Sequence, residues 1–263
     1  MRESTKSRRV RGAEFYKRYF TGRTIDIGCG DDPVTPDAEP FDVQHGDANR
    51  ILEYRPPESY DTVYSSHCLE HMRDVRAALA GWWALVKPGG VLVVVVPDED
   101  LYEQGFWPSL FNADHKATFR ACGPSNWSPV SYDLCALMSA LPNSEPISIA
   151  RQDDGYVHAL RRSGGTAKRA LRRFVRLALL SLDRIGLATP RIEQFLYATL
   201  NRLRCPIDQT NQVTREGALA QIEAIVRKRG DISAASSQDW DRIRTNLQGP
   251  QPDHEVNGTL KSA

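Results

Sequence analysis

The sequence predicts an α/β fold organised around an open, mostly parallel β-sheet. Arg23–Ile27 reads as a short strand that runs directly into a glycine turn, Gly28-Cys29-Gly30. Val91–Val96 is an almost purely β-branched run, which is typical of a strand buried on both faces of a parallel sheet. A strand followed by a glycine turn, early in an alternating β/α chain, is where open parallel sheets bind nucleotide-like ligands.

The composition is that of a protein with a substantial core. With 263 residues, of which 41% are hydrophobic, the chain has room for one large domain or one domain with an appendage. A net charge of +1 predicts no global attraction to nucleic acid. The five cysteines show no paired spacing, so we expect reduced thiols in a cytoplasmic protein and neither a disulfide framework nor a zinc site.

The first forty residues set up the glycine turn. Residues 1–11 form a basic segment without an apolar core, so they predict a flexible arm and not a secretory signal. Ala13–Phe20 predicts a short helix. Prolines interrupt Asp31–Pro40, which excludes an ordinary helix there. A dinucleotide-binding unit would have a third glycine and a helix at this point, so an NAD or FAD enzyme is disfavoured.

The central segment continues the alternation. Ser59–Ser66 predicts a strand, and residues 74–86 predict a helix with Asp74 as its N-cap. Lys87-Pro88-Gly89-Gly90 is a typical helix stop before the Val91–Val96 strand.

The next segment predicts one more helix and a closing hairpin. Ser128-Pro129 has the sequence of a helix start. Residues 146–151 and 156–161 read as strands, and Asp154-Gly155 between them is a hairpin signal. The pattern therefore ends in an antiparallel pair.

The character of the chain changes after Gly164-Gly165. Residues 166–204 predict basic helices, and residues 212–229 predict an amphipathic helix. The polar sequence from Asp231 onward predicts disorder. We therefore divide the chain into a basic arm (1–11), an α/β domain (12–162), a basic helical appendage (163–230) and a disordered tail (231–263).

Several short patterns fall in one order and spacing. They are Asp26-x-Gly28-x-Gly30, Asp42, Gly46-Asp47-Ala48, Tyr60-Asp61, His67-Cys68-Leu69-Glu70-His71 and Lys87-Pro88-Gly89-Gly90. Together, over residues 12–161, they resemble a class I S-adenosylmethionine-dependent methyltransferase. The stretch Val96–Gln104 is similar to methyltransferase-domain proteins of cell-surface glycan pathways. The resemblance implies a Rossmann-like, seven-stranded sheet with an antiparallel last strand and helices on both faces.

The same resemblance implies where S-adenosylmethionine binds. The backbone of Gly28, Cys29 and Gly30 would pass under the methionine part of the cofactor. Asp42 would accept hydrogen bonds from the ribose hydroxyls, with Asp37 and Glu39 as alternatives because a short proline-broken link replaces the usual helix before it.

Further cofactor contacts follow from the resemblance. Asp47, with the backbone of Ala48, would meet the adenine amino edge. Asp26 would orient the glycine turn or the cofactor's amino group. Ser66 and His67 would border the sulfonium.

The acceptor site is expected beyond the Val91–Val96 strand, because ligands lie at the carboxyl ends of parallel strands. A hydroxyl acceptor needs a base within hydrogen-bonding reach. We interpret His115 as that base, oriented by Asp114 or Asp98, and His67 as its competitor; the ordinary pKa of histidine, about 6.5, suits the task. We assign no metal ligands, although the loop acids with His115 offer an alternative Mg²⁺ site. That site would use Asp98, Asp100, Asp114 and His115.

The expected function is methyl transfer to a hydroxyl of a sugar or glycan intermediate. The alternatives are a methyltransferase acting on a small metabolite and a catalytically silent cofactor-binding partner in a glycan-assembly complex. No nucleic acid is expected as a partner. The basic amphipathic stretch within residues 161–191 is compatible with peripheral contact at the inner face of a membrane, or with a helix packed on the domain with its arginines in water.

Overall fold

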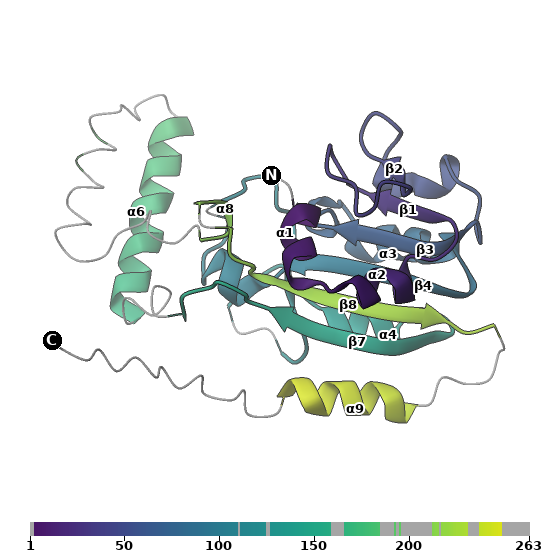
Figure 1. Ribbon diagram of the computed structural model, residues 1–263. Coiled ribbons are helices and arrows are strands. Elements are labelled where there is room, and N and C mark those ends of the chain that lie inside the picture. Colours follow the sequence, from purple (N-terminus) through teal and green to yellow (C-terminus); the bar gives the residue numbers. More distant parts are fainter. Residues whose placement is uncertain are drawn as a thin grey trace, which may run out of the picture.

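The fold is built on one twisted sheet whose strand order is β2-β1-β3-β4-β8-β7. The computed structural model describes residues 3–109, 111–124, 127–158, 166–184, 192, 195, 212–215, 217–230 and 237–248. The six strands are β1 (Thr24–Ile27), β2 (Glu39–Phe41), β3 (Tyr60–Ser66), β4 (Val86–Pro97), β7 (Ser144–Gln152) and β8 (Gln221–Lys228). Seven strands were expected in this sheet, and the described residues supply six (Figure 1).

The remaining elements surround this sheet or extend from it. The helices are α1 (Glu3–Val10), α2 (Ala13–Tyr19), α3 (Val75–Leu85), α4 (Leu134–Ser139), α6 (Thr166–Arg184), α8 (Gln212–Arg215) and α9 (Ser237–Gln248). The short helical turns are η1 (Ala48–Glu53), η2 (Leu69–His71) and the π-helical η3 (Glu99–Glu103). Two further strands, β5 (Thr118–Arg120) and β6 (Ser131–Asp133), pair in parallel in a separate small sheet.

Two apolar layers cover the two faces of the sheet. On one face, side chains of α3, α4 and α9 pack against alternate strand residues such as Leu92 and Val94. On the other face, Val93 and Val95 pack with Tyr19 of α2. Successive residues of β4 therefore point to opposite faces of the sheet, and both faces are covered. This explains why Val91–Val96 is a continuous apolar run.

Of the two helix starts expected at Asp74 and at Ser128-Pro129, only the first is present. Asp74 Oδ1 accepts hydrogen bonds from the N–H groups of Arg76 (2.9 Å) and Ala77 (3.0 Å) and so begins α3. The helix start expected at Ser128-Pro129 is wrong. Asp133 caps α4 instead, by accepting from the Ala136 N–H at 2.8 Å, because the preceding residues are used by the β5–β6 pair.

The largest correction concerns residues 212–229, which were expected to be an amphipathic helix. Gln221–Lys228 is the strand β8, antiparallel to β4 on one side and to β7 on the other. Ile222, Ala224 and Val226 lie in the core on the face that α4 covers, whereas Ile225 faces α2. Pairing with a strand on each side outweighs the helix propensity of this stretch. Residues 217–230 therefore belong to the sheet and not to a helical appendage.

The antiparallel strand implied by the resemblance is therefore present, but it is not residues 156–161. Tyr156–His158 are not in a strand, and the Tyr156 hydroxyl donates to the Leu101 carbonyl at 2.8 Å. Residues 159–161 lie outside the described residues. The expected hairpin at Asp154-Gly155 is wrong because β7 pairs with β8 and not with the segment that follows it.

The two ends of the chain are more ordered than their sequences indicate. The expected flexible arm is the helix α1, whose Thr5 and Ser7 hydrogen-bond to Asp32 and Gln221. In the expected disordered tail, α9 packs against β7 and α4, and Trp240 is buried in the main core. The rest of the tail lies outside the described residues.

The basic segment expected to be helical is α6 in its described part, and residues 185–204 lie outside the described residues apart from Ile192 and Phe195. Within the parts of the chain that the structure covers, no helix is both long enough and apolar enough to cross a membrane.

Candidate functional site

The glycine turn lies at the carboxyl end of β1, where the backbone turns sharply. Gly28 has φ +79° and Gly30 has φ +56°, both in the left-handed region that favours glycine. The Gly28 N–H donates to the Phe41 carbonyl of β2 at 2.7 Å. The Gly30 N–H donates to Asp42 Oδ2 at 2.7 Å, so the turn and Asp42 form one unit across two strand ends.

Gly28 and Gly30 are glycines for different structural reasons. A Cβ on Gly28 would lie 2.5 Å from the Cβ of Cys68, so this glycine is required by packing. A Cβ on Gly30 would meet no atom of the described chain within 4 Å. The open side of Gly30 leaves room for a ligand to lie against the backbone.

Asp26 is buried and holds the segment that follows the turn. Its Oδ2 accepts a hydrogen bond from the Val34 N–H at 2.6 Å. Burial raises the pKa of Asp26 to about 7, although the hydrogen bond from Val34 opposes the rise. Asp26 therefore holds Val34, in the segment after the glycine turn, and its expected role towards the turn or the cofactor's amino group stays a prediction.

Asp47 and Ala48 have local structural roles. Asp47 Oδ1 accepts from the Asn49 backbone N–H at 2.9 Å and from its side-chain amide at 2.7 Å, which begins η1 and lowers the pKa of Asp47. The Ala48 carbonyl accepts from the Trp82 indole N–H at 2.9 Å. Of the alternatives to Asp42, Glu39 is paired with Arg23 and Arg55.

Cys29 and Ser66 lie at neighbouring strand ends. Burial raises the pKa of the half-buried Cys29 thiol to about 11, so it stays protonated at neutral pH. Ser66 ends β3, and its buried hydroxyl has no hydrogen-bond partner among the residues that the structure places.

His67 follows Ser66 and has a positive φ of 54°. Its Nε2 lies 3.0 Å from Gln221 Oε1 of β8, and its Nδ1 lies 3.4 Å from Glu70 Oε1. Burial by itself lowers the pKa of His67, but Glu3 and Glu70 outweigh it and raise the value to about 9. His67 is therefore an imidazolium at neutral pH, which makes it a poor proton acceptor.

His115 is buried beside the same carboxylate. Its Nδ1 lies 2.7 Å from Glu103 Oε1, and its Nε2 lies 4.0 Å from Glu70 Oε1. The residue that orients the ring is Glu103, which the sequence did not reveal as part of the site.

The expected orienting roles of Asp114 and Asp98 are wrong. Asp114 Oδ2 pairs with His71 Nδ1 at 2.9 Å. Asp98 is fully buried, pairs with Arg151 at 2.6 Å and caps η3. Both carboxylates are satisfied by partners other than His115.

Glu70 lies at the centre of this histidine–carboxylate cluster, which we define as His67, Glu70, His71, Glu103 and His115. The Glu70 side chain is inaccessible to solvent, and its oxygens face three imidazole rings. Burial raises the pKa of Glu70, but the neighbouring histidines outweigh burial and lower it. The sequence signal was the pattern His67-Cys68-Leu69-Glu70-His71, which contains three of these five residues.

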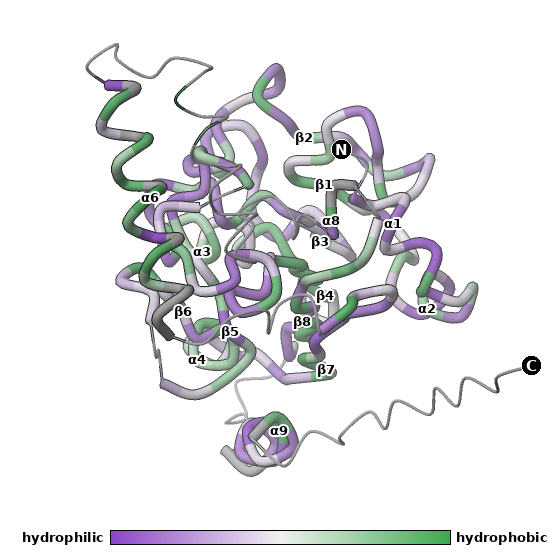
Figure 2. Tube along the Cα trace, turned by 90° about the vertical axis from the view of Figure 1, so that its left-hand side faces the viewer, coloured by the Kyte–Doolittle hydropathy of each residue, from purple (hydrophilic) through white to green (hydrophobic). Residues whose placement is uncertain are grey.

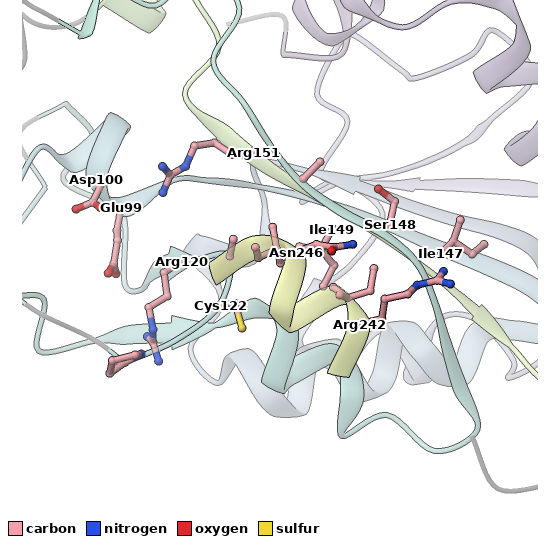
Figure 3. Close-up of a pocket in the computed structure, with 15 residues that line it drawn as sticks. Glu99, Asp100, Arg120, Cys122, Ile147, Ser148, Ile149, Arg151, Arg242 and Asn246 are labelled. Atoms are coloured by element: carbon pink, nitrogen blue, oxygen red, sulfur yellow. The ribbon is translucent and has the colours of Figure 1, made fainter. Parts of the chain in front are cut away.

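A cavity of about 610 Å³ lies between β7 and α9, and none of the cluster residues lines it (Figure 3). Glu99 and Asp100 of the segment after β4 line one end, and Arg120, Arg151 and Arg242 also line it. His115 and Asp114 do not line this cavity, so the expected acceptor site around His115 stays a prediction.

A parallel sheet with a glycine turn and acids at its strand ends defines a nucleotide-type cofactor site. The family model described as "Methyltransferase domain" matches residues 6–140, more than half of the chain. The chain therefore belongs to the methyltransferase-domain family, with the class I fold and S-adenosylmethionine as its cofactor.

Known proteins show more distant similarity. The ubiquinone biosynthesis O-methyltransferase of Rhodopseudomonas palustris (strain BisB18) is 25% identical over 130 residues, which cover 40% of this chain and 50% of that protein. The chain thus spans about half the length of the curated relative it matches.

Two solved structures show the same kind of similarity. An S-adenosylmethionine-dependent methyltransferase from Archaeoglobus fulgidus is 14% identical, with a TM-score of 0.43 over 87% of this chain and 95% of that one. One from Thermotoga maritima is 12% identical, with a TM-score of 0.41 over 87% and 88% of the two chains.

Proposed function

We propose that this protein transfers a methyl group from S-adenosylmethionine to a hydroxyl oxygen, and that the acceptor is a sugar or glycan intermediate. The observation that carries the proposal is the buried His115–Glu103 pair, 2.7 Å apart, beside the cluster that follows β3. A histidine fixed through Nδ1 by a buried carboxylate presents Nε2 as a proton acceptor.

The residues at the strand ends fit the cofactor. The open side of Gly30 leaves room for the methionine part, and Asp42 stands at the end of β2 where a ribose would be bound. The unpartnered Ser66 hydroxyl is available to the cofactor or acceptor. When bound, the cofactor supplies an electrophilic methyl group on a positively charged sulfur.

The proposed transfer breaks two bonds and forms two. With cofactor and acceptor bound, His115 Nε2 would accept the proton of the acceptor hydroxyl. The cofactor would supply the methyl group to that oxygen and leave as its demethylated product. Glu103 holds the imidazole and stabilises the imidazolium that forms. The protein's main contribution is to hold acceptor and methyl in line, about 3 Å apart, with water excluded.

A small metabolite hydroxyl is the second candidate acceptor. The relative from Rhodopseudomonas palustris is by name an O-methyltransferase of ubiquinone biosynthesis, which favours oxygen as the acceptor atom and a small molecule as the substrate. The third candidate function is that of a catalytically silent protein, which would bind the cofactor at the same strand ends but transfer no methyl group.

The test combines cofactor calorimetry with an acceptor screen using radiolabelled S-adenosylmethionine. We expect binding of cofactor and its demethylated product, and label transfer to a glycan or small-molecule fraction. His115→Gln should bind cofactor normally but lose transfer. His158→Gln is the matched control, because His158 also pairs with an acid, Asp153, at 2.7 Å but away from the cluster. Cofactor binding without transfer to any fraction would favour the silent reading.

A further inference from the structure

Three side chains of the histidine–carboxylate cluster converge on one point. One ligand atom from each of Glu70, His71 and His115 lies within 4.8 Å of the other two. We infer that these residues bind a divalent transition-metal ion such as Zn²⁺. This site is distinct from the Mg²⁺ site that the loop acids suggested in the sequence, and Asp98 and Asp100 take no part in it.

Both imidazole rings are already oriented as metal ligands. Asp114 Oδ2 holds His71 Nδ1 at 2.9 Å, and Glu103 Oε1 holds His115 Nδ1 at 2.7 Å. The two Nε2 atoms therefore face the interior, each 4.0 Å from Glu70 Oε1. A carboxylate on the far nitrogen of each ring is the usual outer-shell arrangement of histidine metal sites.

Glu70 supplies the independent reason for an ion. Its side chain is inaccessible to solvent, and neither oxygen has a hydrogen-bond partner in the described part of the protein. A buried carboxylate without such partners is costly. The nearest compensating group is His67, whose Nδ1 lies 3.4 Å from Oε1. A bound cation would satisfy the remaining lone pairs.

The distances and donor atoms favour a transition metal. Zinc binds imidazole nitrogen at about 2.0–2.1 Å and carboxylate oxygen at about 2.0–2.2 Å, so its ligand atoms lie roughly 3.3 Å apart. The two Glu70–imidazole separations are 4.0 Å and all three ligand atoms lie within 4.8 Å, so the ligands would have to move together by roughly 0.7–1.5 Å. Two nitrogens and one oxygen suit zinc, cobalt or iron better than Mg²⁺ or Ca²⁺, which prefer oxygen.

Three protein ligands leave one coordination position open, as in catalytic zinc sites. This part of the inference rests on the proposed function: an acceptor hydroxyl in that position would have its pKa lowered by the ion. In the ion-bound form His115 Nε2 would be a ligand and could not also accept a proton, so the hydroxyl proton would pass to solvent. His115 would act as the base described above only in the ion-free form.

The test measures the ion directly. Protein treated with EDTA and passed through a desalting column is dialysed against Zn²⁺ or Co²⁺, followed by elemental analysis and the visible spectrum of the Co²⁺ form. We expect one equivalent of ion and cobalt absorption typical of nitrogen and oxygen ligands. Glu70→Gln, His71→Gln and His115→Gln should each weaken binding at least 100-fold, and His158→Gln should leave it unchanged.

Asp114→Asn is the sharper variant because Asp114 is exposed on the outer side of His71 and the substitution is compatible with folding. An orienting role predicts about 10- to 100-fold weaker ion binding.

The inference is overturned if the wild type retains less than a tenth of an equivalent of the ion, or if the cluster variants bind the ion as tightly as His158→Gln does. If methyl transfer survives EDTA, the ion has no catalytic role and the proposed function stands. If the protein binds the ion but transfers no methyl group, the metal site stands and the proposed function fails.

A second inference comes from an independent feature, the surface of α6. Phe174 is 70% exposed, and Leu171 (37%) and Leu177 (45%) lie one turn to either side of it, so the helix presents an apolar face to solvent. The sequence of α6 also carries six basic residues and one acid. Apolar and polar positions alternate along the helix (Figure 2).

An exposed apolar face on a strongly basic helix matches the surface of an anionic membrane, where apolar side chains enter the headgroup boundary and arginines meet lipid phosphates. We propose that α6 binds such a surface. Charge complementarity selects a lipid surface carrying negative charge over a neutral one, and the attraction should weaken with salt.

Vesicle co-sedimentation of the full chain tests this proposal. We expect binding to vesicles containing phosphatidylserine, at least tenfold weaker binding to phosphatidylcholine alone, and loss of binding in 0.5 M salt. Phe174→Ser should weaken binding at least fivefold, whereas Leu52→Ser, which removes an exposed leucine elsewhere (47% exposed), should have no effect. The role of α6 would be refuted if the protein bound both vesicle types equally, or if Phe174→Ser bound vesicles as tightly as the wild type.

Discussion

Glu103 Oε1 lies 2.7 Å from His115 Nδ1, and the side chains of both residues are almost completely buried. Glu103 is at the end of the π-helical turn η3, and His115 is twelve residues later, after an irregular loop. The pair therefore fixes the far end of that loop against the strand ends. It also fixes which nitrogen of His115 faces the interior of the cluster.

Glu103→Gln should lower kcat at least about tenfold, because the amide no longer compensates positive charge on the ring that it holds. The KM for S-adenosylmethionine should stay unchanged, since Glu103 is not among the residues at the glycine turn. Steady-state kinetics with the identified acceptor measures both quantities. Asp153→Asn, which alters the exposed His158 pair, is the control. A normal kcat in Glu103→Gln would show that the pair only stabilises the loop.

The two glycines of the turn should separate stability from cofactor binding. Gly28→Ala combines a positive φ with a 2.5 Å approach to Cys68 and should destabilise the protein by about 2–4 kcal/mol. Gly30→Ala has only the positive φ and should cost about 1 kcal/mol, but its methyl group enters the open space and should weaken cofactor binding.

Urea unfolding and cofactor calorimetry on the two variants provide the comparison. The double variant Gly28→Ala/Cys68→Gly removes the atoms that clash and should regain part of the lost stability. If Gly30→Ala binds cofactor as well as the wild type, the ligand does not lie against that side of the turn.

Asp26 should make both stability and cofactor affinity depend on pH. Its folded pKa of about 7 lies above the unfolded value of about 3.9, so the folded state holds an extra proton between these limits. The contribution of Asp26 to stability is therefore most favourable below about pH 4 and is lost as the pH rises towards 7. Asp26→Asn should flatten this dependence in denaturation curves between pH 4.5 and 8.

The cofactor should respond to Asp26 in the opposite direction. Its amino group is positively charged, and the ionised carboxylate attracts it, so affinity should increase as the pH passes through 7. Calorimetry in buffers of different ionisation enthalpy would detect the coupled proton release. A pH-independent affinity that matches that of Asp26→Asn would show that Asp26 acts only on the loop through Val34.

Local signals carried much of the fold prediction. The Asp74 cap, the glycine turn and the β-branched Val91–Val96 run each depend on a few neighbouring residues, and each was recognisable in the sequence. The strand β8 was not, because its ladder partners in β4 and β7 are about 130 and 75 residues earlier in the chain. Only those distant neighbours make an extended backbone favourable for Gln221–Lys228.

The candidate site divides in the same way. Asp42 could be singled out because it follows β2 closely, and the structure places it in contact with the glycine turn through the Gly30 N–H. Its expected contact with the ribose stays a prediction. Glu103 and Glu70 were missed because their importance comes from meeting His115 in space. Nothing in the local sequence separates a buried glutamate facing three imidazoles from an ordinary one on a helical turn.

The burial of Trp240 predicts that α9 contributes to the stability of the domain. Trp240 is 5% exposed and packs in the main core, so Trp240→Ala should cost about 3–5 kcal/mol. Thr245→Ala on the exposed side of the same helix is the control and should change stability by less than about 0.5 kcal/mol. Chemical denaturation of both variants measures the difference, and equal midpoints would mean that α9 does not pack on the sheet in solution.

The buried ion pair between Arg11 and Glu223 predicts that the N-terminal segment is part of the folded unit. Arg11 follows α1 and also donates to the Tyr64 hydroxyl at 3.0 Å, while Glu223 lies in the centre of β8. Arg11→Met leaves the buried Glu223 carboxylate uncompensated and should cost about 3–5 kcal/mol. The double variant Arg11→Met/Glu223→Leu should recover most of that loss, since neither side chain then carries an unpaired buried charge. Denaturation midpoints of the single and double variants test this prediction. If Arg11→Met is as stable as the wild type, residues 1–11 do not pack on the folded domain in solution.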